Sequence, residues 1–202
     1  MKIVGPGFRL PQQVQRIAVV GPTGSGKTTL ARSLATSFAL PCAELDSLFH
    51  GPNWVPRETF LQEVTDFIAK DQWVTEWQYK VARPLLLARA TTLVWLDLPT
   101  GRVQSQLWRR TFRRWATHEE LWHGNREPGL RVLLSRSDNS ILWWGWKYRN
   151  ALRSLPLVVQ EMARGAGIPQ SHLDGLVIVH LRTNKQVHDW LRLQDLPMPY
   201  SA

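Results

Sequence analysis

Eight residues near the start of the sequence restrict its fold more than any other feature. They fit the pattern G-x-x-x-x-G-K-[ST], in which the backbone of a glycine-rich loop surrounds phosphate groups. The loop consists of Gly21, Pro22, Thr23, Gly24, Ser25, Gly26, Lys27 and Thr28. A β-branched apolar stretch, 17–20, precedes it, and a helical pattern over 28–38 follows, with Leu30, Leu34 and Phe38 on one face. This strand–loop–helix context argues against a chance glycine-rich turn.

The residue types in this loop suit a bound nucleotide. Glycines allow the backbone to turn tightly and to point its N–H groups at an anion. The helix that begins there adds the positive end of its dipole. Lys27 is expected to reach the outer phosphates, and the Thr28 hydroxyl is expected to bind Mg²⁺. We therefore predict ATP or GTP together with Mg²⁺ as cofactors, with Thr29 also at the cofactor site.

Strands and helices alternate along the rest of the chain. Beyond 17–20, strands are expected at 42–45, 73–75, 92–96 and 176–181. Helices are expected at 56–70, 84–90, from about 100, at 139–163 with a break near Pro156, and at 184–193, with loops at 47–55 and 165–175. This alternation predicts an α/β fold with a five-stranded parallel sheet and helices on both faces, and together with the phosphate-binding loop it predicts the P-loop NTPase three-layer αβα sandwich. The 202 residues suit a single domain, in which 1–15 form an N-terminal extension without a clear period.

The positive charge of the chain is concentrated in one stretch. Residues 102–153 contain 11 Lys and Arg against 4 Asp and Glu, and so supply +7 of the net charge of +9. In the helix that begins near 100, Val103 and Leu107 share a stripe with Arg110 and Arg114, so the inward face becomes basic. Such a segment is either a nucleic-acid surface or a phosphate clamp.

The stretch 117–136 that follows this helix is broken by glycine and proline and is typical of a lid. A lid that carries arginines, placed directly after a strand of the nucleotide-binding sheet, favours the phosphate clamp. No helix-turn-helix, zinc-finger or RNA-binding signature accompanies the basic residues. We therefore expect a small acceptor molecule as the partner, and a nucleic-acid partner is the less favoured alternative.

Composition further limits location and packing. No apolar run is long enough to span a membrane, and the N-terminus lacks the apolar core of a signal peptide. The single cysteine, Cys42, cannot form an internal disulfide, which favours the cytoplasm, and its predicted strand places it in the core. Several tryptophans lie in apolar patterns and are expected to be mostly buried, with stacking on a nucleobase as the alternative: Trp54, Trp73, Trp77, Trp95, Trp143, Trp144 and Trp146.

Acidic residues follow three of the predicted strands. They are Asp46, Glu76 and Asp97. Because ligands of parallel sheets bind at the carboxyl ends of the strands, these acids are expected on the same rim as the phosphate-binding loop. Glu76 follows the strand expected beside that loop and is, with Thr28, the candidate for Mg²⁺. Asp97 is better explained as a cap, and capping is also the alternative explanation for Asp46.

These features resemble the small P-loop kinases of the adenylate kinase, shikimate kinase and gluconate kinase type. More narrowly, the chain is similar to the proteins called DNA topology modulation proteins, often described as adenylate kinase-like ATPases. The shared marks extend from Ile17 to about Arg149 and include Leu45-Asp46, Pro52-Asn53-Trp54, Trp73-Val74, Tyr79 and Leu96-Asp97-Leu98-Pro99.

The chain departs from this pattern at two places. Glu76-Trp77-Gln78-Tyr79 stands where the family usually has Asp-Gly-Asn-Tyr, so that a carboxylate is kept but Trp77 is expected to reshape the acceptor pocket. Gln106 occupies the place of an arginine that often packs on the nucleobase in these kinases, so recognition of the base must come from elsewhere.

The resemblance implies a Mg²⁺-dependent phosphotransferase that moves the γ-phosphoryl group of ATP to a small-molecule or nucleotide acceptor. Lys27, Asp46 and Arg110 would be catalytic, with Asp46 positioning or deprotonating the acceptor hydroxyl. Arg114 and Arg136 are further candidates for the nucleotide phosphates, with a solvated charge as the alternative for each. The acceptor would be held by Asp46, Arg57, Glu76, Tyr79 and Arg83. The alternatives are a nucleotide-dependent nucleic-acid-binding protein, in line with the family label, and a regulatory ATPase without an acceptor.

Overall fold

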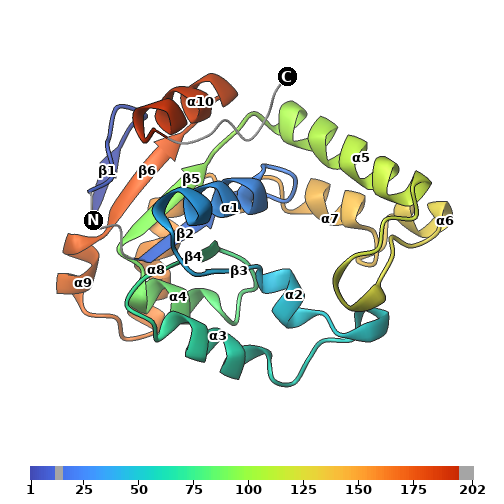
Figure 1. Ribbon diagram of the computed structural model, residues 1–202, viewed down its shortest axis with the longest axis horizontal. Coiled ribbons are helices and arrows are strands. Elements are labelled where there is room, and N and C mark those ends of the chain that lie inside the picture. The colour runs from blue at the N-terminus through green and yellow to red at the C-terminus, as the bar shows by residue number, and fades with distance from the viewer. Residues whose placement is uncertain (12–15, 196–202) are drawn as a thin grey trace.

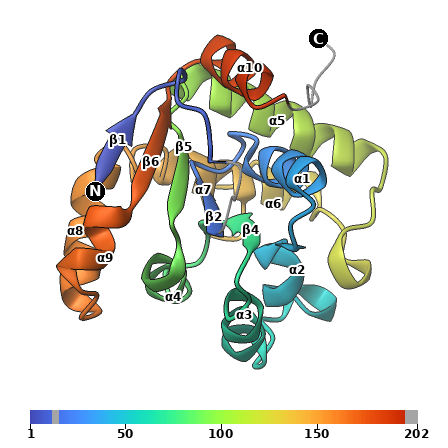
Figure 2. The ribbon, with the colours of Figure 1, turned by 60° about the vertical axis from the view of Figure 1, so that its left-hand side comes forward.

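A six-stranded parallel sheet forms the centre of the molecule, which the computed structural model describes over residues 1–11 and 16–195. The strand order is β1-β6-β5-β2-β4-β3, and every neighbouring pair is parallel. The strands are β1 (Lys2–Val4), β2 (Arg16–Val20), β3 (Cys42–Ala43), β4 (Trp73–Glu76), β5 (Thr92–Leu96) and β6 (Val177–Leu181). Helices cover both faces (Figures 1 and 2), so the predicted α/β sandwich is confirmed.

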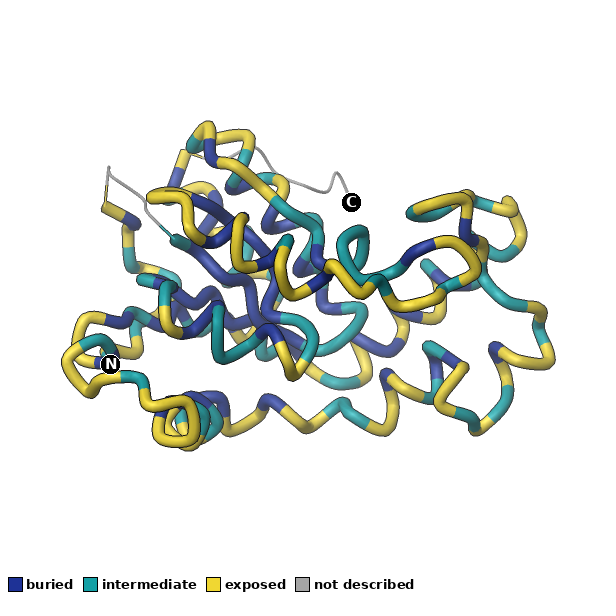
Figure 3. The backbone as a smooth tube through the Cα atoms, turned by 90° about the horizontal axis from the view of Figure 1, so that it is seen from below, coloured by how far each residue is buried: buried dark blue, intermediate teal, exposed yellow. Residues whose placement is uncertain are grey.

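Alternation along the central strand divides the core into two halves. Ile17 and Val19 point to one face of the sheet and Ala18 and Val20 to the other, and all four are fully buried. The first face is covered by α1 (Lys27–Phe38), α5 (Thr100–Ala116) and α10 (Asn184–Leu193). The opposite face is covered by α3 (Phe60–Ile68), α4 (Arg83–Arg89), α8 (Leu155–Gly165) and α9 (Gln170–Gly175). Figure 3 shows the buried residues concentrated in the centre of the molecule.

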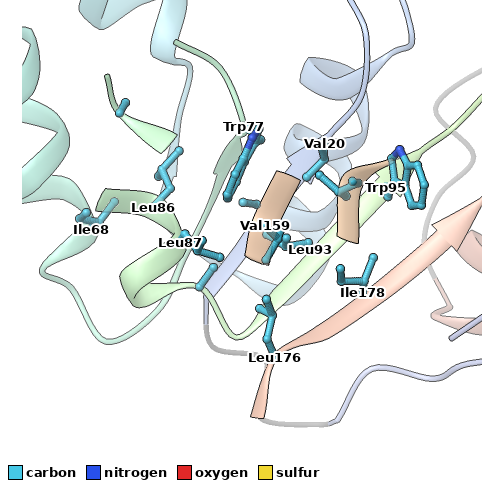
Figure 4. Close-up of a cluster of buried hydrophobic side chains, with 14 of the residues drawn as sticks. Val20, Ile68, Trp77, Leu86, Leu87, Leu93, Trp95, Val159, Leu176 and Ile178 are labelled. Atoms are coloured by element: carbon cyan, nitrogen blue, oxygen red, sulfur yellow. The ribbon is translucent and has the colours of Figure 1, made fainter. Parts of the chain in front are cut away.

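The tryptophans divide between the core and the surface. Trp73, Trp77 and Trp95 are at most 4% exposed, as expected. Figure 4 shows Trp77 packed in the core near Val20 and Leu86, so this residue acts through packing. The burial predicted for Trp144 and Trp146 is wrong, because the short helix α7 (Ile141–Lys147) presents them to solvent. Trp54 and Trp143 are half-buried.

The N-terminal residues contribute a strand that the sequence does not predict. β1 pairs with β6 at the edge of the sheet, so the sheet has six strands and not five. It is only three residues long and leaves Ile3 51% exposed, and so it lacks the alternation that marks a strand. Residues 12–15 of the predicted extension lie outside the described part of the chain.

Several predicted boundaries also move. β3 ends at Ala43, so Asp46, expected at the end of this strand, lies instead in a short helix, α2 (Leu45–Phe49), which also takes up the start of the loop expected at 47–55. Cys42 is exposed, because β3 is a two-residue edge strand with one neighbour. The helix predicted over 139–163 is two helices, and α9 occupies part of the predicted loop 165–175.

Two connecting segments contain only short elements. These are the turns η1 (Pro52–Trp54) and η2 (Trp122–Gly124) and the helix α6 (Leu130–Leu133). They lie between α2 and α3 and between α5 and α7, where the sequence predicts broken structure. Within the described residues, no helix combines the length and apolar character needed to cross a membrane.

Candidate active site

The phosphate-binding loop joins β2 to α1, as predicted. Gly24 and Gly26 have φ values of 89° and 91°, in the left-handed region that favours glycine. Gly24 is also packed beneath α5, where an added Cβ would lie 2.8 Å from the Leu107 side chain and 2.9 Å from the Val103 carbonyl oxygen. The loop therefore needs glycine at this position for its backbone conformation and for the close approach of α5.

Lys27 begins α1 and is only 7% exposed. Its ammonium group donates a hydrogen bond to the Pro22 carbonyl oxygen at 3.1 Å, and it forms no ion pair in the described part of the chain. Burial lowers the pKa of Lys27, the nearby Glu76 and Asp46 carboxylates raise it, and Arg110 lowers it. A buried ammonium group whose one hydrogen-bond partner is a neutral carbonyl suits an anionic ligand.

Glu76 lies at the carboxyl end of β4, directly beside the phosphate-loop strand. The register pairs Glu76 with Val19 of β2, which confirms the neighbour that the sequence predicts for this strand. The side chain is 2% exposed. Burial raises the pKa of Glu76, whereas Lys27 and a hydrogen bond with the Thr28 side chain lower it. A hydroxyl and a carboxylate in contact are oxygen ligands of the kind that Mg²⁺ takes.

Asp46 belongs to a second polar group on the far side of Glu76. The Tyr79 hydroxyl donates to Asp46 Oδ1 at 2.6 Å and lies 3.1 Å from Nε2 of His50. The Gln78 amide lies 3.4 Å from both carboxylate oxygens of Asp46. Burial raises the pKa of Tyr79, and the Asp46 carboxylate raises it further. Tyr79 is thus a neutral donor that fixes the orientation of Asp46.

His50 and Gln78 are site residues that the sequence analysis did not assign. His50 Nδ1 and Gln78 Oε1 are buried and have no hydrogen-bond partner in the described part of the chain. Burial lowers the pKa of His50, while Asp46 raises it. Little in the sequence signals a role for His50, because it directly follows α2 with an extended backbone, in a stretch expected to be a loop.

Two arginines near this group lack partners. The guanidinium groups of Arg83, in the first turn of α4, and Arg110, on α5, form no hydrogen bond or ion pair within residues 1–11 and 16–195, and their Nε atoms are buried. Burial lowers the pKa of both side chains, and for Arg110 the neighbouring Arg114 lowers it further. Both arginines also lower the pKa of Lys27, which places their charges near the phosphate-binding loop. Unpaired, partly buried guanidinium groups are costly and well suited to a phosphate or carboxylate.

Arg114 lies one turn beyond Arg110 but already has acidic partners. Its guanidinium is 3.3 Å from Glu119 and 3.9 Å from Glu127. The inward face of α5 therefore becomes basic, as predicted, with one free arginine and one neutralised arginine.

The remaining two predicted arginines are held elsewhere. Arg57 forms a two-point ion pair with Glu63, with N–O distances of 2.5 and 3.1 Å. Arg136 is exposed and lies over the Trp143 ring, 5.9 Å from its centroid. No contact in the described part of the chain joins either guanidinium to the polar groups around Lys27 and Asp46.

A pocket beside the phosphate-binding loop is lined by both apolar and polar side chains. The apolar lining includes Leu30, Leu96 and Leu98, and α5 and α10 contribute polar side chains. The remaining lining residues are Ser25, Gly26, Gln106, Asn184, Val187 and His188. A lining of this composition suits a flat, largely apolar ring with polar atoms at its edge. Asn184 and His188 are candidate contacts that the sequence analysis did not name.

Comparison with known proteins yields structural similarity alone. No protein-family model matches the sequence, and no curated protein matches it. Among solved structures, the chain is similar to a shikimate kinase from Acinetobacter baumannii in complex with shikimate, with 15% identity, a TM-score of 0.49, and coverage of 90% of this chain and 92% of that chain.

Two other solved structures are also similar to this chain. A gluconokinase from Sinorhizobium meliloti 1021 has 16% identity and a TM-score of 0.43, with 93% of this chain and 94% of that chain covered. A sugar kinase from Janibacter sp. HTCC2649 has 23% identity and a TM-score of 0.37, with 48% and 68% covered. All three similar structures are named as kinases.

Proposed function

We propose that this protein is a Mg²⁺-dependent kinase that transfers the γ-phosphoryl group of ATP to a small-molecule or nucleotide acceptor. The observation that carries the proposal is that two carboxylates, Glu76 and Asp46, and two arginines without side-chain partners in the described residues lie near the buried Lys27. Lys27 and Arg110 would bind the transferred group, while Asp46 would face the acceptor. Narrower membership of the adenylate kinase-like or DNA topology modulation type rests on the sequence marks given above.

The arrangement suits an in-line transfer of the phosphoryl group. The acceptor hydroxyl oxygen would attack the γ-phosphorus, the bond from phosphorus to the bridging oxygen of ADP would break, and the hydroxyl proton would pass to Asp46. The hydrogen bond from Tyr79 would keep one Asp46 oxygen occupied and leave the other for the acceptor. Positive charge from Lys27 and Arg110 would stabilise the charge that develops on the transferred group.

The residues present fit a magnesium ion. The Thr28 hydroxyl and the Glu76 carboxylate would hold it, since Thr28 lies near enough to lower the pKa of Glu76. The ion would neutralise phosphate charge when bound. The remaining phosphate contacts would come from the backbone of the loop from Gly21 to Thr29.

The pocket between the phosphate-binding loop and α10 would bind the nucleobase. Its lining offers the Gln106 amide, the NH₂ group of Asn184, whose oxygen accepts from Arg102, and the His188 ring as hydrogen-bonding groups for the edge of a purine. ATP and GTP differ at this edge of the base. Comparing the affinities of wild type for the two nucleotides would show which base is preferred, and the same comparison in an Asn184→Ala variant would test whether the base lies in this pocket.

The acceptor would lie between Asp46, Glu76, Tyr79 and Arg83. Arg83 has no partner in the described residues and would bind a negatively charged group of the acceptor. Arg57 could contribute only after releasing Glu63. Arg114 would support Arg110 at the phosphates, and Arg136 would need to leave Trp143 to join them.

The decisive experiment is a transfer assay with purified protein, ATP and Mg²⁺. A panel of nucleosides, nucleotides and small hydroxyl-containing metabolites would be screened for ADP formation above the rate without an acceptor. At least one acceptor should raise ADP formation and become phosphorylated, and Lys27→Ala should abolish both effects. If no acceptor raises the rate, the protein is better described as a nucleotide switch.

A further inference from the structure

The segment between α5 and α7 is tied to the loop that carries Asp46. Asn125 is 5% exposed, although its neighbours His123, Gly124 and Arg126 are exposed. Its side-chain amide donates to the carbonyl oxygens of Gly51 at 2.9 Å and Trp122 at 2.8 Å. Its side-chain oxygen accepts from the Trp54 backbone N–H at 2.9 Å. One buried side chain therefore joins η2 to η1, which lie side by side in Figure 1.

Further contacts strengthen the same junction. The Trp54 indole donates to the Arg126 carbonyl oxygen at 3.1 Å, and the Trp122 indole donates to Glu44 at 3.3 Å. Each side of the junction also contains residues in the left-handed region, with φ values of 60° for Trp54 and 57° for His123. Bulky residues rarely adopt this conformation unless surrounding contacts hold them in it. The junction is therefore held by specific contacts on both sides and is not an incidental contact of two loops.

The other end of the same short segment reaches the basic helix. Glu127, two residues after Asn125, faces Arg114 at 3.9 Å. Burial raises the pKa of Glu127, while Arg114 and Arg110 lower it. Residues 125–127 therefore make contacts on two sides. Asn125 contacts the segment 44–57, which carries Asp46 and is called the acceptor loop below, and Glu127 contacts the arginine-bearing face of α5.

We propose that Asn125 is a positioning residue that couples the acceptor loop 44–57 to the arginines of α5. A displacement of η1 would pull on Asn125 and, through Glu127, on Arg114 and the neighbouring Arg110. The acceptor side of the site would thereby set the position of the residues that bind the nucleotide phosphates. This inference rests on the proposed function, because it assigns Arg110 to the phosphates.

Hydrogen exchange of wild type and Asn125→Ala, with and without a non-hydrolysable ATP analogue and Mg²⁺, tests the coupling. In the ligand-free protein, exchange at 51–57 should become about tenfold faster in the variant, because the Trp54 N–H loses its acceptor. The analogue should protect 21–29 in both proteins. It should protect 51–57 in wild type but not in the variant.

Two further variants serve as controls. Asn139→Ala makes the same substitution at an exposed asparagine with no contact in the described part of the chain, and it should behave as wild type. Trp54→Phe removes the indole bond to Arg126 and part of the ring that packs on His50 but keeps the Trp54 N–H bond to Asn125, so its effect on exchange should be smaller than that of Asn125→Ala. Melting temperatures would verify that all variants fold. If Asn125→Ala does not fold, Trp54→Phe serves as the test variant in its place.

The outcomes separate this inference from the proposed function. If the analogue protects 21–29 in both proteins but Asn125→Ala exchanges as wild type at 51–57, the coupling is wrong and nucleotide binding stands. If the analogue protects nothing in wild type, the proposed function and the coupling both fail. Once an acceptor is known, Asn125→Ala should raise the acceptor KM severalfold while leaving the Kd for ATP within about twofold, a split that general destabilisation would not produce.

Discussion

The two halves of the candidate site are built in different ways. The phosphate-binding half is local: Lys27 donates to a carbonyl five residues earlier, on a loop between a fully buried strand and a helix. The acceptor half is assembled from distant parts of the chain, because Tyr79 and Asp46 are 33 residues apart and Asn125 and Gly51 are 74 apart. We infer that the first half is largely preformed, and that the second is the part whose geometry responds to ligands.

The largest expected effect lies in the acceptor half. Asp46→Asn keeps the shape of the side chain and an oxygen for the Tyr79 hydroxyl, but it removes the proton acceptor. Transfer to the true acceptor should fall by about 10² to 10⁴ if Asp46 is a general base. The affinity for ATP, measured by isothermal titration, should remain nearly that of wild type.

Asp71→Asn is the matched control, since Asp71 is exposed and has no contact in the described part of the chain. Slow hydrolysis of ATP by water should suffer less than transfer in the Asp46 variant, because it needs no bound acceptor. If Asp46→Asn transfers phosphate at the wild-type rate, Asp46 is only an acidic residue in the first turn of α2, and the acceptor half has been placed incorrectly.

The second effect tests the phosphate-binding half. Lys27→Ala removes the buried ammonium group without disturbing the sheet, and turnover should fall by about 10² to 10³. ATP binding in the presence of Mg²⁺ should be lost or much weakened in isothermal titration. Lys80→Ala, at an exposed lysine after β4, should leave both unchanged. Equal affinity in wild type and the folded Lys27 variant would contradict the nucleotide site.

The third prediction concerns Arg110, whose replacement should raise stability and lower activity. Arg110→Met replaces an unpaired, partly buried guanidinium with an apolar side chain of similar length. The variant should melt at a temperature about 2 to 4 °C higher if it gains about 1 kcal/mol, because no bound anion offsets the charge in the free protein. Its turnover should nevertheless fall sharply. A lower melting temperature would mean that Arg110 supports the fold.

The same difference between the halves explains what the sequence could predict. The phosphate-binding loop, its strand and helix, and the position of Glu76 beside it all follow from patterns within a few residues, and the structure has them in place. The sheet type follows from the alternation of elements. The edge strands β1 and β3 were missed or misjudged because they are two or three residues long and partly exposed.

The acceptor half left weaker signals. Whether Arg57 is free or paired depends on Glu63, and a sequence gives no rule for choosing between an ion pair and a ligand contact. Asn125 lies in a stretch that reads as a polar loop, and only its contacts with Gly51 and Trp54 show its importance. The exposure of Trp144 depends on the short length of α7, which the pattern over 139–163 concealed.

The smallest expected effect concerns Glu76, where the two halves meet. Because burial raises the pKa of Glu76 in the folded state, the wild-type protein loses stability as the pH rises from the unfolded-state value of about 4.5 through the folded-state value. Glu76→Gln carries no such cost. The variant should therefore melt about 1 to 3 °C above wild type at pH 7 without metal, and this difference should shrink toward zero as the pH falls to about 4.5.

Mg²⁺ should then reverse the order of the two melting temperatures, so that wild type melts above Glu76→Gln. If Glu76 and Thr28 hold the ion, Mg²⁺ together with an ATP analogue should raise the melting temperature of wild type more than that of Glu76→Gln. Glu58→Gln, at an exposed glutamate before α3, should show neither the pH-dependent difference nor a change in the response to Mg²⁺. An equal gain with Mg²⁺ in wild type and Glu76→Gln would remove Glu76 from the metal site. A melting temperature of Glu76→Gln below wild type at pH 7 would show that its contacts with Lys27 and Thr28 outweigh the cost of burying its charge.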